Sequence, residues 1–492
     1  MIARLKAPFL WITMGVLTAL AQVFPDLWFV SLFGLFVAFT YVKRGEFGFK
    51  SGFLFGFGYF LTSLNWIASP FFVDAAQHGW MAPFAVAAMA SGGALFWGAA
   101  GWGARRLSLG PIGFAVFLAL AEFLRGHLFG GFPWALIGYI WVETPILQLA
   151  ASVGPYGLTL ITVVGVAAMA TAVRAKSYLG GGLCVLAWLT LWGLGLALRP
   201  ATEFSQHTVR LIQPNAPQHE KWNTDKIPVF FERALSLTRA KGQQAPDVVV
   251  WPETSVAPLL NFARPELQDI AGAAAGAPVL LGALRSEYPF YYNSAALIDG
   301  AGDLISTYDK TRLVPFGEYV PFGSALKSIG VTALAAPENY GFIANEDPQL
   351  MAIPMLGHAK VLICYEAVFP RFVRKGPRPD LLVQITNDAW FGAYIGPFQH
   401  LTQARFRAVE MGVPVLRAAN TGISAIIAPN GALTQASEMN EAAFVDGHVP
   451  LARGETLWSR FGNLWLCVSF AVFAGSFWGQ RRKDIDPNIV KR

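Results

Sequence analysis

The first two hundred residues consist mainly of long apolar runs, and this feature limits the fold more than any other. Between Ala7 and Arg199 only 14 Asp, Glu, Lys or Arg residues occur, in small clusters that separate the runs. The runs have the length that an α-helix needs to cross a bilayer, roughly 17 to 25 residues. Of all 492 residues, 54% are hydrophobic and 14% charged, which is too apolar for an ordinary soluble protein. We therefore expect a polytopic α-helical membrane domain.

The apolar runs predict about eight membrane-spanning helices, seven of them in residues 1–199. A second domain at residues 200–456 follows the seventh span, and residues 457–492 hold the eighth span and a tail. The start of the chain has features of a signal peptide, but more spans follow at once, so we expect an uncleaved first helix. The expected spans are 8–24, 27–42, 52–73, 80–103, 111–126, 156–173, 178–198 and 461–479.

Most basic residues fall in alternate loops between the expected spans, whereas the opposite loops carry only Arg125 beside Asp26, Asp74 and Glu143, and this asymmetry indicates the orientation in the membrane. Because Lys-rich and Arg-rich loops stay in the cytoplasm, both termini are expected there and residues 200–456 on the opposite side. The net charge of +6 comes mostly from these loops and the tail, so we expect no nucleic-acid binding. The basic residues on the cytoplasmic side are Arg4, Lys6, Lys43, Arg44, Lys50, Arg105, Arg106, Arg174, Lys176, Arg481, Arg482 and Lys483.

Three cysteines argue against a disulfide-linked scaffold. Cys184 and Cys467 fall inside expected spans, where they are badly placed to reach Cys364. Cys364 is therefore expected to be a lone thiol outside the cytoplasm. In the membrane half, Glu122 and Arg125 are spaced to share one helix face. We expect a structural ion pair there, with contact to a lipid headgroup or anchoring of the re-entrant stretch HLFGGFPW as the alternative.

Residues 200–456 have a different composition, with short β-branched runs that alternate with helical patterns. The runs SAALID and LISTYD, joined by GAG, predict a hairpin, so the sheet should be mixed rather than purely parallel. The alternation predicts a layered α/β domain. The expected strands are 209–214, 247–252, 278–284, 294–299, 304–309, 360–365, 381–386 and 423–429, and the expected helices are 228–241, 266–275 and 398–412.

Three strand ends in this domain carry residues that a purely structural interpretation does not need: Glu253, Lys310 and Cys364. Taken singly, they could be a helix cap, a solvated charge and a small buried side chain. Together, a base, a cation and a thiol are what acyl transfer through a thioester requires. Glu253 would accept the thiol proton, while Lys310 stabilises the thiolate and the oxyanion. The N–H of Tyr365 would be a second oxyanion donor.

Several motifs resemble one known family. They are WPET, YDK-x-R-LVPFGEYVP, CYE, TNDAWFG-x-x-x-GPFQH and AANTGISAIIAPNG in the second domain, with EFLRGHLFGGFPW and SVGPYG in the first. This set is similar to the apolipoprotein N-acyltransferase family, the membrane-bound branch of the nitrilase superfamily. The resemblance runs along almost the whole chain, and it implies a four-layer αββα sandwich for residues 200–456.

The resemblance also implies a reaction and a location. A fatty acyl chain would pass from a phospholipid, typically phosphatidylethanolamine, through a cysteine thioester to the α-amino group of the N-terminal diacylglyceryl cysteine of an apolipoprotein. This is the last step of lipoprotein maturation, and the catalytic domain would lie in the periplasm at the bacterial inner membrane. We expect a monomer that contacts membrane lipids, the phospholipid donor and the apolipoprotein acceptor.

Residue by residue, the resemblance makes Glu253 the base, Lys310 the oxyanion stabiliser and Cys364 the nucleophile. It assigns supporting roles to Glu318, which would orient Lys310, and to Tyr365 and Glu366; a turn carboxylate stays open for Glu318. Trp222 matches a tryptophan of a mobile loop over the site, with plain surface packing as the alternative.

Two aromatic residues and a histidine follow in the TNDAWFG and GPFQH motifs. Trp390 and Phe391 would form an apolar wall for acyl chains, or part of the core. His400 is expected to be structural. Because Cys, His and Asp nowhere cluster at zinc-ligand spacing, we expect no metal and no cofactor.

Two other functions share some of these features. A tethered nitrilase-like amidase would use the same triad, although a hydrolase of soluble amides needs no eight-helix platform. A transporter with an extracytoplasmic binding domain would explain the spans, but the membrane half shows no convincing inverted repeat. Acyl-chain length, headgroup preference and the lipoproteins used are not encoded in any motif.

Overall fold

The computed structural model describes residues 2–43, 47–321, 341–346 and 349–485, so Arg44 lies outside the described residues. The chain divides into two compact units. One comprises Met1–Thr62, Ala90–Leu198 and Glu455–Arg492, and the other Ser63–Met89 and Arg199–Gly454. We call them the helical unit and the sheet unit.

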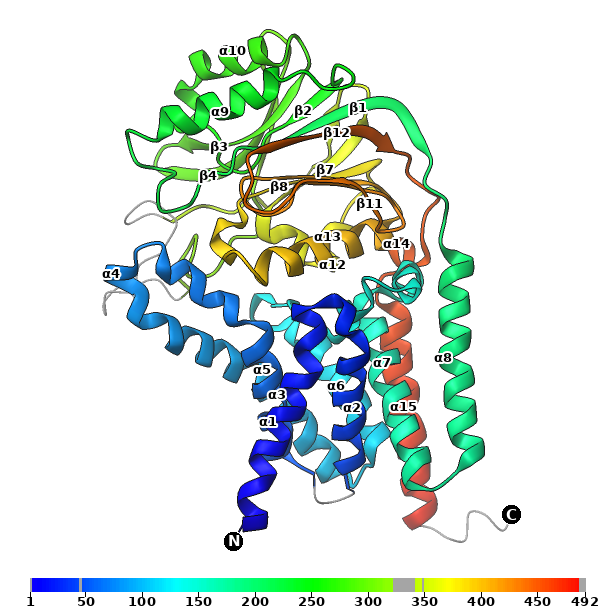
Figure 1. Ribbon diagram of the computed structural model, residues 1–492. Coiled ribbons are helices and arrows are strands. Elements are labelled where there is room, and N and C mark those ends of the chain that lie inside the picture. Colours follow the sequence, from blue (N-terminus) through cyan, green and yellow to red (C-terminus); the bar gives the residue numbers. More distant parts are fainter. Residues whose placement is uncertain (1, 44–46, 322–340, 347–348, 486–492) are drawn as a thin grey trace. The chain divides into compact units, whose positions relative to one another are not determined.

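The helical unit is built from antiparallel helices, coloured blue to cyan in Figure 1 with red for the C-terminal part. Glu122 and Arg125 are buried in it and form the expected ion pair at 2.7 Å, and the indole N–H of Trp97 donates to Glu122 at 2.8 Å. Its helices are α1 (Ile2–Val23), α2 (Trp28–Tyr41), α3 (Phe49–Ser63), α5 (Ala82–Arg106) from Ala90 onward, α6 (Pro111–Arg125), α7 (Ala150–Arg174), α8 (Tyr178–Leu198), α14 (Leu457–Phe461) and α15 (Leu464–Ile485).

Among the described residues, three helical segments are long and apolar enough to cross a membrane: Ala75–Arg106, Pro145–Arg174 and Tyr178–Leu198. Helices α2, α3 and α6 have 14 or 15 residues and span about 22 Å, less than a hydrocarbon core of about 30 Å. The eight spans of the sequence analysis therefore stay a prediction.

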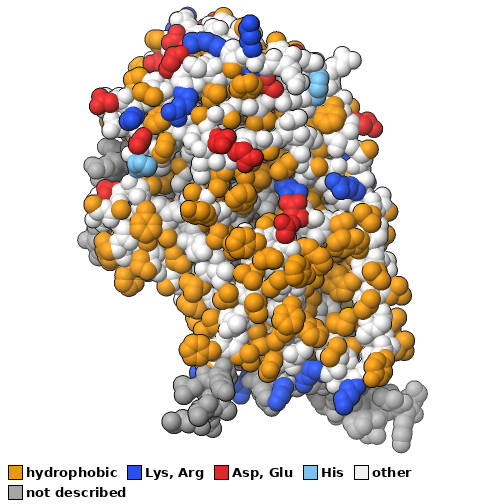
Figure 2. Space-filling model, viewed as in Figure 1, with side chains coloured by type: hydrophobic (Ala, Val, Ile, Leu, Met, Phe, Trp, Pro, Cys, Tyr) orange, Lys and Arg blue, Asp and Glu red, His pale blue; other side chains and the backbone are white. Residues whose placement is uncertain are grey.

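The surface of the helical unit is apolar. Along α8, Leu183, Leu186 and Leu189 expose more than half of their side-chain area. Figure 2 shows hydrophobic side chains over the helices and basic side chains gathered at the end where α1 begins. Large exposed apolar surfaces mark interaction with other apolar matter, and such a surface is typical of a membrane protein.

The third predicted span is wrong at its C-terminal end. Helix α3 stops at Ser63 instead of 73, and short 3-10 turns follow at Asn65–Phe72, a stretch in which Pro70 has no N–H for an α-helical hydrogen bond. After α4 (Ala75–His78), α5 begins at Ala82. Residues 63–89 pack in the sheet unit, where the Gln399 amide donates to the Ser63 carbonyl at 2.9 Å.

The sheet unit contains two six-stranded mixed sheets. The first has the order β12-β1-β2-β3-β4-β5 and the second β11-β10-β9-β8-β7-β6. The first consists of β1 (Phe204–Gln213), β2 (Val248–Val250), β3 (Val279–Glu287), β4 (Phe290–Ile298), β5 (Leu304–Asp309) and β12 (Ala443–Pro450). The second consists of β6 (Met351–Ile353), β7 (Gly357–Ile363), β8 (Leu381–Thr386), β9 (Val415–Ala419), β10 (Ala425–Ile427) and β11 (Leu433–Ala436).

Helices cover the outer faces of the two sheets and complete the expected four layers (Figure 1). Helices α9 (Ile227–Arg239) and α10 (Arg264–Ala273) lie over the first sheet, and α12 (Pro370–Arg374) and α13 (Gly396–Met411) over the second. A buried apolar cluster that includes Trp251 joins α9 and α10 to the first sheet. The predicted hairpin is confirmed, since β4 and β5 pair antiparallel with Ser294 opposite Asp309.

Four strands were missed: β6, β9, β11 and β12. Strand β9, VLRAA, is fully buried but carries a charged residue, Arg417, which interrupts the apolar pattern that predicts a strand. The others are short or half exposed, and β12 acquires its conformation by antiparallel pairing with β1, more than 200 residues away.

Candidate active site

Glu253, Lys310 and Cys364 lie together between the two sheets. Glu253 follows β2, Lys310 directly follows β5, and Cys364 directly follows β7. Their exposed fractions are 6%, 1% and 4%. Strand ends at the edge of a layered α/β domain are where such folds place reactive side chains, so a carboxylate, a cation and a thiol come together in a site that is almost closed to solvent.

Both carboxylate oxygens of Glu253 are held in place. Oε1 accepts a hydrogen bond from the Asn293 amide at 2.8 Å and lies 3.5 Å from Lys310 Nζ. Oε2 accepts from the backbone N–H of Asn387 at 2.9 Å. Asn293 lies on β4 and Asn387 just after β8, so donors from both sheets orient the base.

Lys310 is paired with two carboxylates. Nζ donates to Glu318 at 2.8 Å, and the second oxygen of Glu318 accepts from the N–H of Val314 at 2.8 Å. Burial lowers the pKa of Lys310, but the negative charges of Glu318, Glu253 and Cys364 more than offset it and hold the pKa above its usual value. Lys310 is therefore held in its charged form, with Nζ hydrogen-bonded to a Glu318 carboxylate that is itself held by Val314.

Cys364 sits in a sharp turn between β7 and a short 3-10 helix, Cys364–Val368, with φ +51°. This left-handed conformation is strained for a residue with a side chain. Burial and the charge of Glu253 raise the pKa of the thiol well above its ordinary value, and Lys310 and Thr386 counteract this only in part. The raised pKa favours the protonated thiol in the resting protein.

Glu366 connects the turn that carries Cys364 to the loop that carries Lys310. One oxygen accepts from the N–H groups of Thr311 at 2.6 Å and Arg312 at 3.0 Å, and the other from the N–H of Ile363 at 2.8 Å. The Tyr308 hydroxyl lies 2.9 Å from both oxygens. Glu366 thus positions the two loops. The neighbouring Tyr365 packs edge-on against Phe369 at 4.9 Å.

We expect Glu366→Gln to lower the free energy of unfolding by about 1–3 kcal/mol, because the new amide NH₂ would face N–H donors and leave one of them unpaired. The labelling of Cys364 by an acyl donor should slow in parallel. Thermal unfolding in detergent measures the first effect. Glu287→Gln, at a side chain that is 71% exposed, is the matched control. Equal melting temperatures in the two variants would show that Glu366 does not hold the loops.

A buried polar network that the sequence analysis missed lies beneath Cys364. His400 Nδ1 is 3.0 Å from Asp388, and its Nε2 is 3.1 Å from the Cys364 carbonyl. Arg417 pairs with the other oxygen of Asp388. Burial raises the pKa of Asp388, but Arg417 and His400 bring it below its usual value. Gly422, at φ +96°, lies so close to Asp388 that a side chain there would collide with it.

Phe391 and Trp390, which were expected to form an apolar wall or part of the core, differ in how deeply they are buried. Phe391 is buried, and its ring meets those of His400 and Trp66 edge-on, both at 5.1 Å. Trp390 is only partly buried. Trp66 belongs to the segment 63–89, so the amino-terminal half of the chain supplies part of the wall beside the site.

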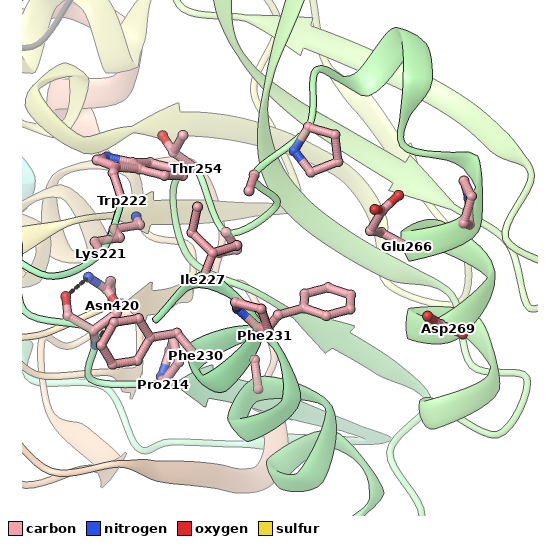
Figure 3. Close-up of a pocket in the computed structure, with 17 residues that line it drawn as sticks. Pro214, Lys221, Trp222, Ile227, Phe230, Phe231, Thr254, Glu266, Asp269 and Asn420 are labelled. Carbon is pink, nitrogen blue, oxygen red and sulfur yellow. Dashed lines mark hydrogen bonds between the residues drawn. The ribbon is translucent and has the colours of Figure 1, made fainter. Parts of the chain in front are cut away.

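Trp222 lines a pocket together with Lys221 and Thr254, the residue that follows Glu253 (Figure 3). Its ring is 43% exposed and lies 5.2 Å from the ammonium group of Lys221. Lys221 is buried and donates to the Glu253 carbonyl at 3.2 Å. Burial lowers the pKa of Lys221 to about 8, although Glu253 acts in the opposite direction. Sequence reasoning missed Lys221, because one lysine in a polar loop carries no signal.

Sequence comparisons cover both halves of the chain. Residues 208–456 match the carbon-nitrogen hydrolase family, and residues 14–168 match the apolipoprotein N-acyltransferase N-terminal domain. Apolipoprotein N-acyltransferases of Brucella melitensis and Caulobacter vibrioides are 39% and 37% identical to the chain, over 84% and 85% of its length and 81% and 83% of theirs. The chain belongs to the apolipoprotein N-acyltransferase family. The resemblance noted from the motifs is confirmed.

Membership of the apolipoprotein N-acyltransferase family makes the chain an acyltransferase of lipoproteins, and the amidase and transporter alternatives are set aside. A solved amidase from Nesterenkonia sp. is similar at a TM-score of 0.36 and 18% identity, over 55% of this chain and 97% of the amidase. Among the described residues, no group of three or more His, Cys, Asp or Glu side chains has the arrangement of a metal site.

Proposed function

We propose that the chain transfers a fatty acyl group from a phospholipid, through a thioester on Cys364, to the α-amino group of a diacylglyceryl cysteine at the N-terminus of an apolipoprotein. The observation that carries this proposal is the buried set of Glu253, Lys310 and Cys364. A permanent cation, an oriented carboxylate and a protonated thiol are suited to an ester or thioester carbonyl, because each carries out one defined step.

In the first half-reaction, Glu253 takes the thiol proton as Sγ attacks the ester carbonyl of the phospholipid. The resulting oxyanion is stabilised by Lys310 Nζ and by the backbone N–H of Tyr365. When the C–O bond breaks, the lysophospholipid oxygen takes the proton from Glu253 and leaves. The product is the Cys364 thioester, and Glu253 is again a carboxylate.

In the second half-reaction, the α-amino group of the acceptor attacks the thioester carbonyl and gives a proton to Glu253. The C–S bond then breaks, and the thiolate of Cys364 recovers that proton. One base and one oxyanion site thus serve both halves, so two bulky lipids use the same site in turn. Phe391 packs against Trp66 and against His400, which lies next to the Cys364 carbonyl. These apolar rings support exclusion of water from the thioester until the acceptor binds.

The order of the two half-reactions tests this proposal. With labelled phosphatidylethanolamine alone, we expect label on Cys364 before any acceptor is added, and its transfer to the amine afterwards. Initial rates at several concentrations of both substrates should give parallel double-reciprocal lines. Intersecting lines, with no label on Cys364 from phospholipid alone, would indicate direct transfer in a ternary complex and would leave the thiol without this role.

We also propose a multi-pass arrangement in the inner membrane with about eight spans, both termini in the cytoplasm and the sheet unit in the periplasm. The basic residues in alternate loops, such as Arg105, Arg106 and Lys176, support this orientation. The enzyme would act as a monomer.

A membrane-impermeant thiol reagent tests the orientation. In a Cys184→Ala/Cys467→Ala background, a cysteine at the exposed position Gln243 should react from the periplasmic side of intact spheroplasts. A cysteine at the exposed position Lys176 should react only after lysis. The reverse pattern would place the site in the cytoplasm and would contradict a role in lipoprotein maturation.

A further inference from the structure

A pocket of about 270 Å³ lies beside the catalytic base in the sheet unit. Its middle is apolar and is formed by Ile227, Phe230 and Phe231 at the start of α9. Figure 3 shows these side chains between Lys221 and Asn420 on one side and Glu266 and Asp269 on the other. The pocket is therefore apolar in its middle, with a cation at one end and two carboxylates at the other.

The end of the pocket formed by Glu266 and Asp269 is suited to bind a positively charged or hydrogen-bond-donating group. Glu266 lies in the first turn of α10, and its Oε2 atom is buried without a hydrogen-bond partner among the described residues. A buried carboxylate oxygen that lacks a donor is costly. Asp269 lines the same end and is exposed. A cation that enters the pocket would satisfy Glu266.

The end of the pocket that holds Lys221 is joined to Glu253 by a hydrogen bond. Lys221 donates to the Glu253 carbonyl, and Thr254 and Ser255, which directly follow Glu253, also line the pocket. In the second half-reaction the acceptor amine must contact the Glu253 carboxylate. The peptide that follows this amine then starts next to the segment Glu253–Ser255, part of which lines the pocket, and Lys221 offers N–H groups to a peptide carbonyl there.

The size and the polar ends of the pocket decide between the possible occupants. A fatty acyl chain needs an apolar channel about as long as half a bilayer, roughly 15 Å, without charges at its ends. A lysine or arginine side chain has an apolar stem and a cationic head, and such side chains bury their stems along apolar walls. The phosphoethanolamine headgroup has only two methylenes and would place its phosphate between Ile227, Phe230 and Phe231.

We propose that this pocket binds a basic side chain from the first residues after the modified cysteine of the acceptor peptide, with its stem against α9 and its head at Glu266. This inference rests on the proposed function. It predicts that the enzyme distinguishes acceptors by a charge outside the lipid-modified residue.

Synthetic diacylglyceryl peptides test the pocket, with Lys or Glu placed at the second, third or fourth residue. At one of these positions, the purified full-length enzyme should prefer Lys over Glu in kcat/KM by about five-fold, the size of a partly exposed ion pair. In Glu266→Gln/Asp269→Asn the preference should fall to nearly one. The matched control is Glu287→Gln/Asp303→Asn, which removes two carboxylates that are each 71% exposed and lie outside the pocket, and it should keep the preference.

The possible results separate this proposal from the proposed function. If the wild-type enzyme never labels Cys364 and never acylates a peptide, the proposed function fails. If it acylates all peptides equally, or if the pocket variant keeps the wild-type preference, only the pocket proposal fails. A pocket variant that instead changes Cys364 labelling by phosphatidylethanolamine relative to phosphatidylglycerol would assign the pocket to the donor headgroup and overturn the peptide proposal.

Discussion

Replacing Cys364 with alanine is expected to abolish N-acylation while a folded protein remains. Without Sγ no thioester forms, and removal of the nucleophile from a triad of this kind lowers kcat by at least about 10⁴-fold. The substitution removes one sulfur atom from a buried turn and leaves the contacts of Lys310, Glu253 and Glu366 in place. Acylation of a diacylglyceryl peptide, measured by mass spectrometry, gives the readout.

The other two cysteines are the controls for Cys364→Ala. Cys184 and Cys467 lie on α8 and α15, outside the sheet unit, and Cys467 is exposed. Cys184→Ala and Cys467→Ala should keep near wild-type activity. An active Cys364→Ala enzyme would refute the thioester mechanism, whether or not Cys184→Ala and Cys467→Ala are active.

Glu253→Gln is expected to prevent formation of the acyl-enzyme, with a loss of about 10²–10⁴-fold in the rate of Cys364 labelling. The amide keeps the size of the side chain, and its oxygen still accepts from Asn293 or Asn387, but it cannot take the thiol proton. The remaining rate should rise with pH, because hydroxide then replaces the base. Labelling by a fluorescent phospholipid at pH 7 and pH 9 measures both effects.

This variant also distinguishes a general base from a preformed thiolate. The charge of Glu253 raises the pKa of Cys364, so its removal favours the thiolate. If the resting enzyme held a thiolate beside Lys310, Glu253→Gln would label as fast as the wild type or faster. Glu232→Gln, at a side chain that is 61% exposed on α9, controls for the loss of a carboxylate.

Much of the sheet unit could be predicted from the sequence, because its central strands are apolar runs bounded by turns. The strand ends after β2, β5 and β7 were expected to carry Glu253, Lys310 and Cys364, and the structure brings these residues together. The partners that orient them were not predictable in the same way. Asn293 and Arg417 are polar residues inside buried strands, a signal that could have been noticed, yet their carboxylate partners Glu253 and Asp388 lie 40 and 29 residues away in the chain.

The boundaries of the membrane helices were harder to predict, because hydropathy measures the composition of a segment and not its backbone conformation. Residues 64–73 are as apolar as a span, and only Asn65 and Pro70 indicate that the α-helix ends. In this region Trp66 packs against Phe391 and the Ser63 carbonyl accepts from Gln399, and these two partners belong to motifs more than 300 residues further along the chain.

The position of Ser63–Met89 in the sheet unit has a practical consequence for anyone who wishes to isolate the catalytic half in soluble form. Cutting the chain at residue 199 would remove Trp66 from the Phe391 ring and Ser63 from the Gln399 amide. The excised fragment would then present apolar wall residues of its own site to water and to neighbouring molecules. A useful minimal catalyst must therefore carry this segment as a grafted peptide or a fused loop.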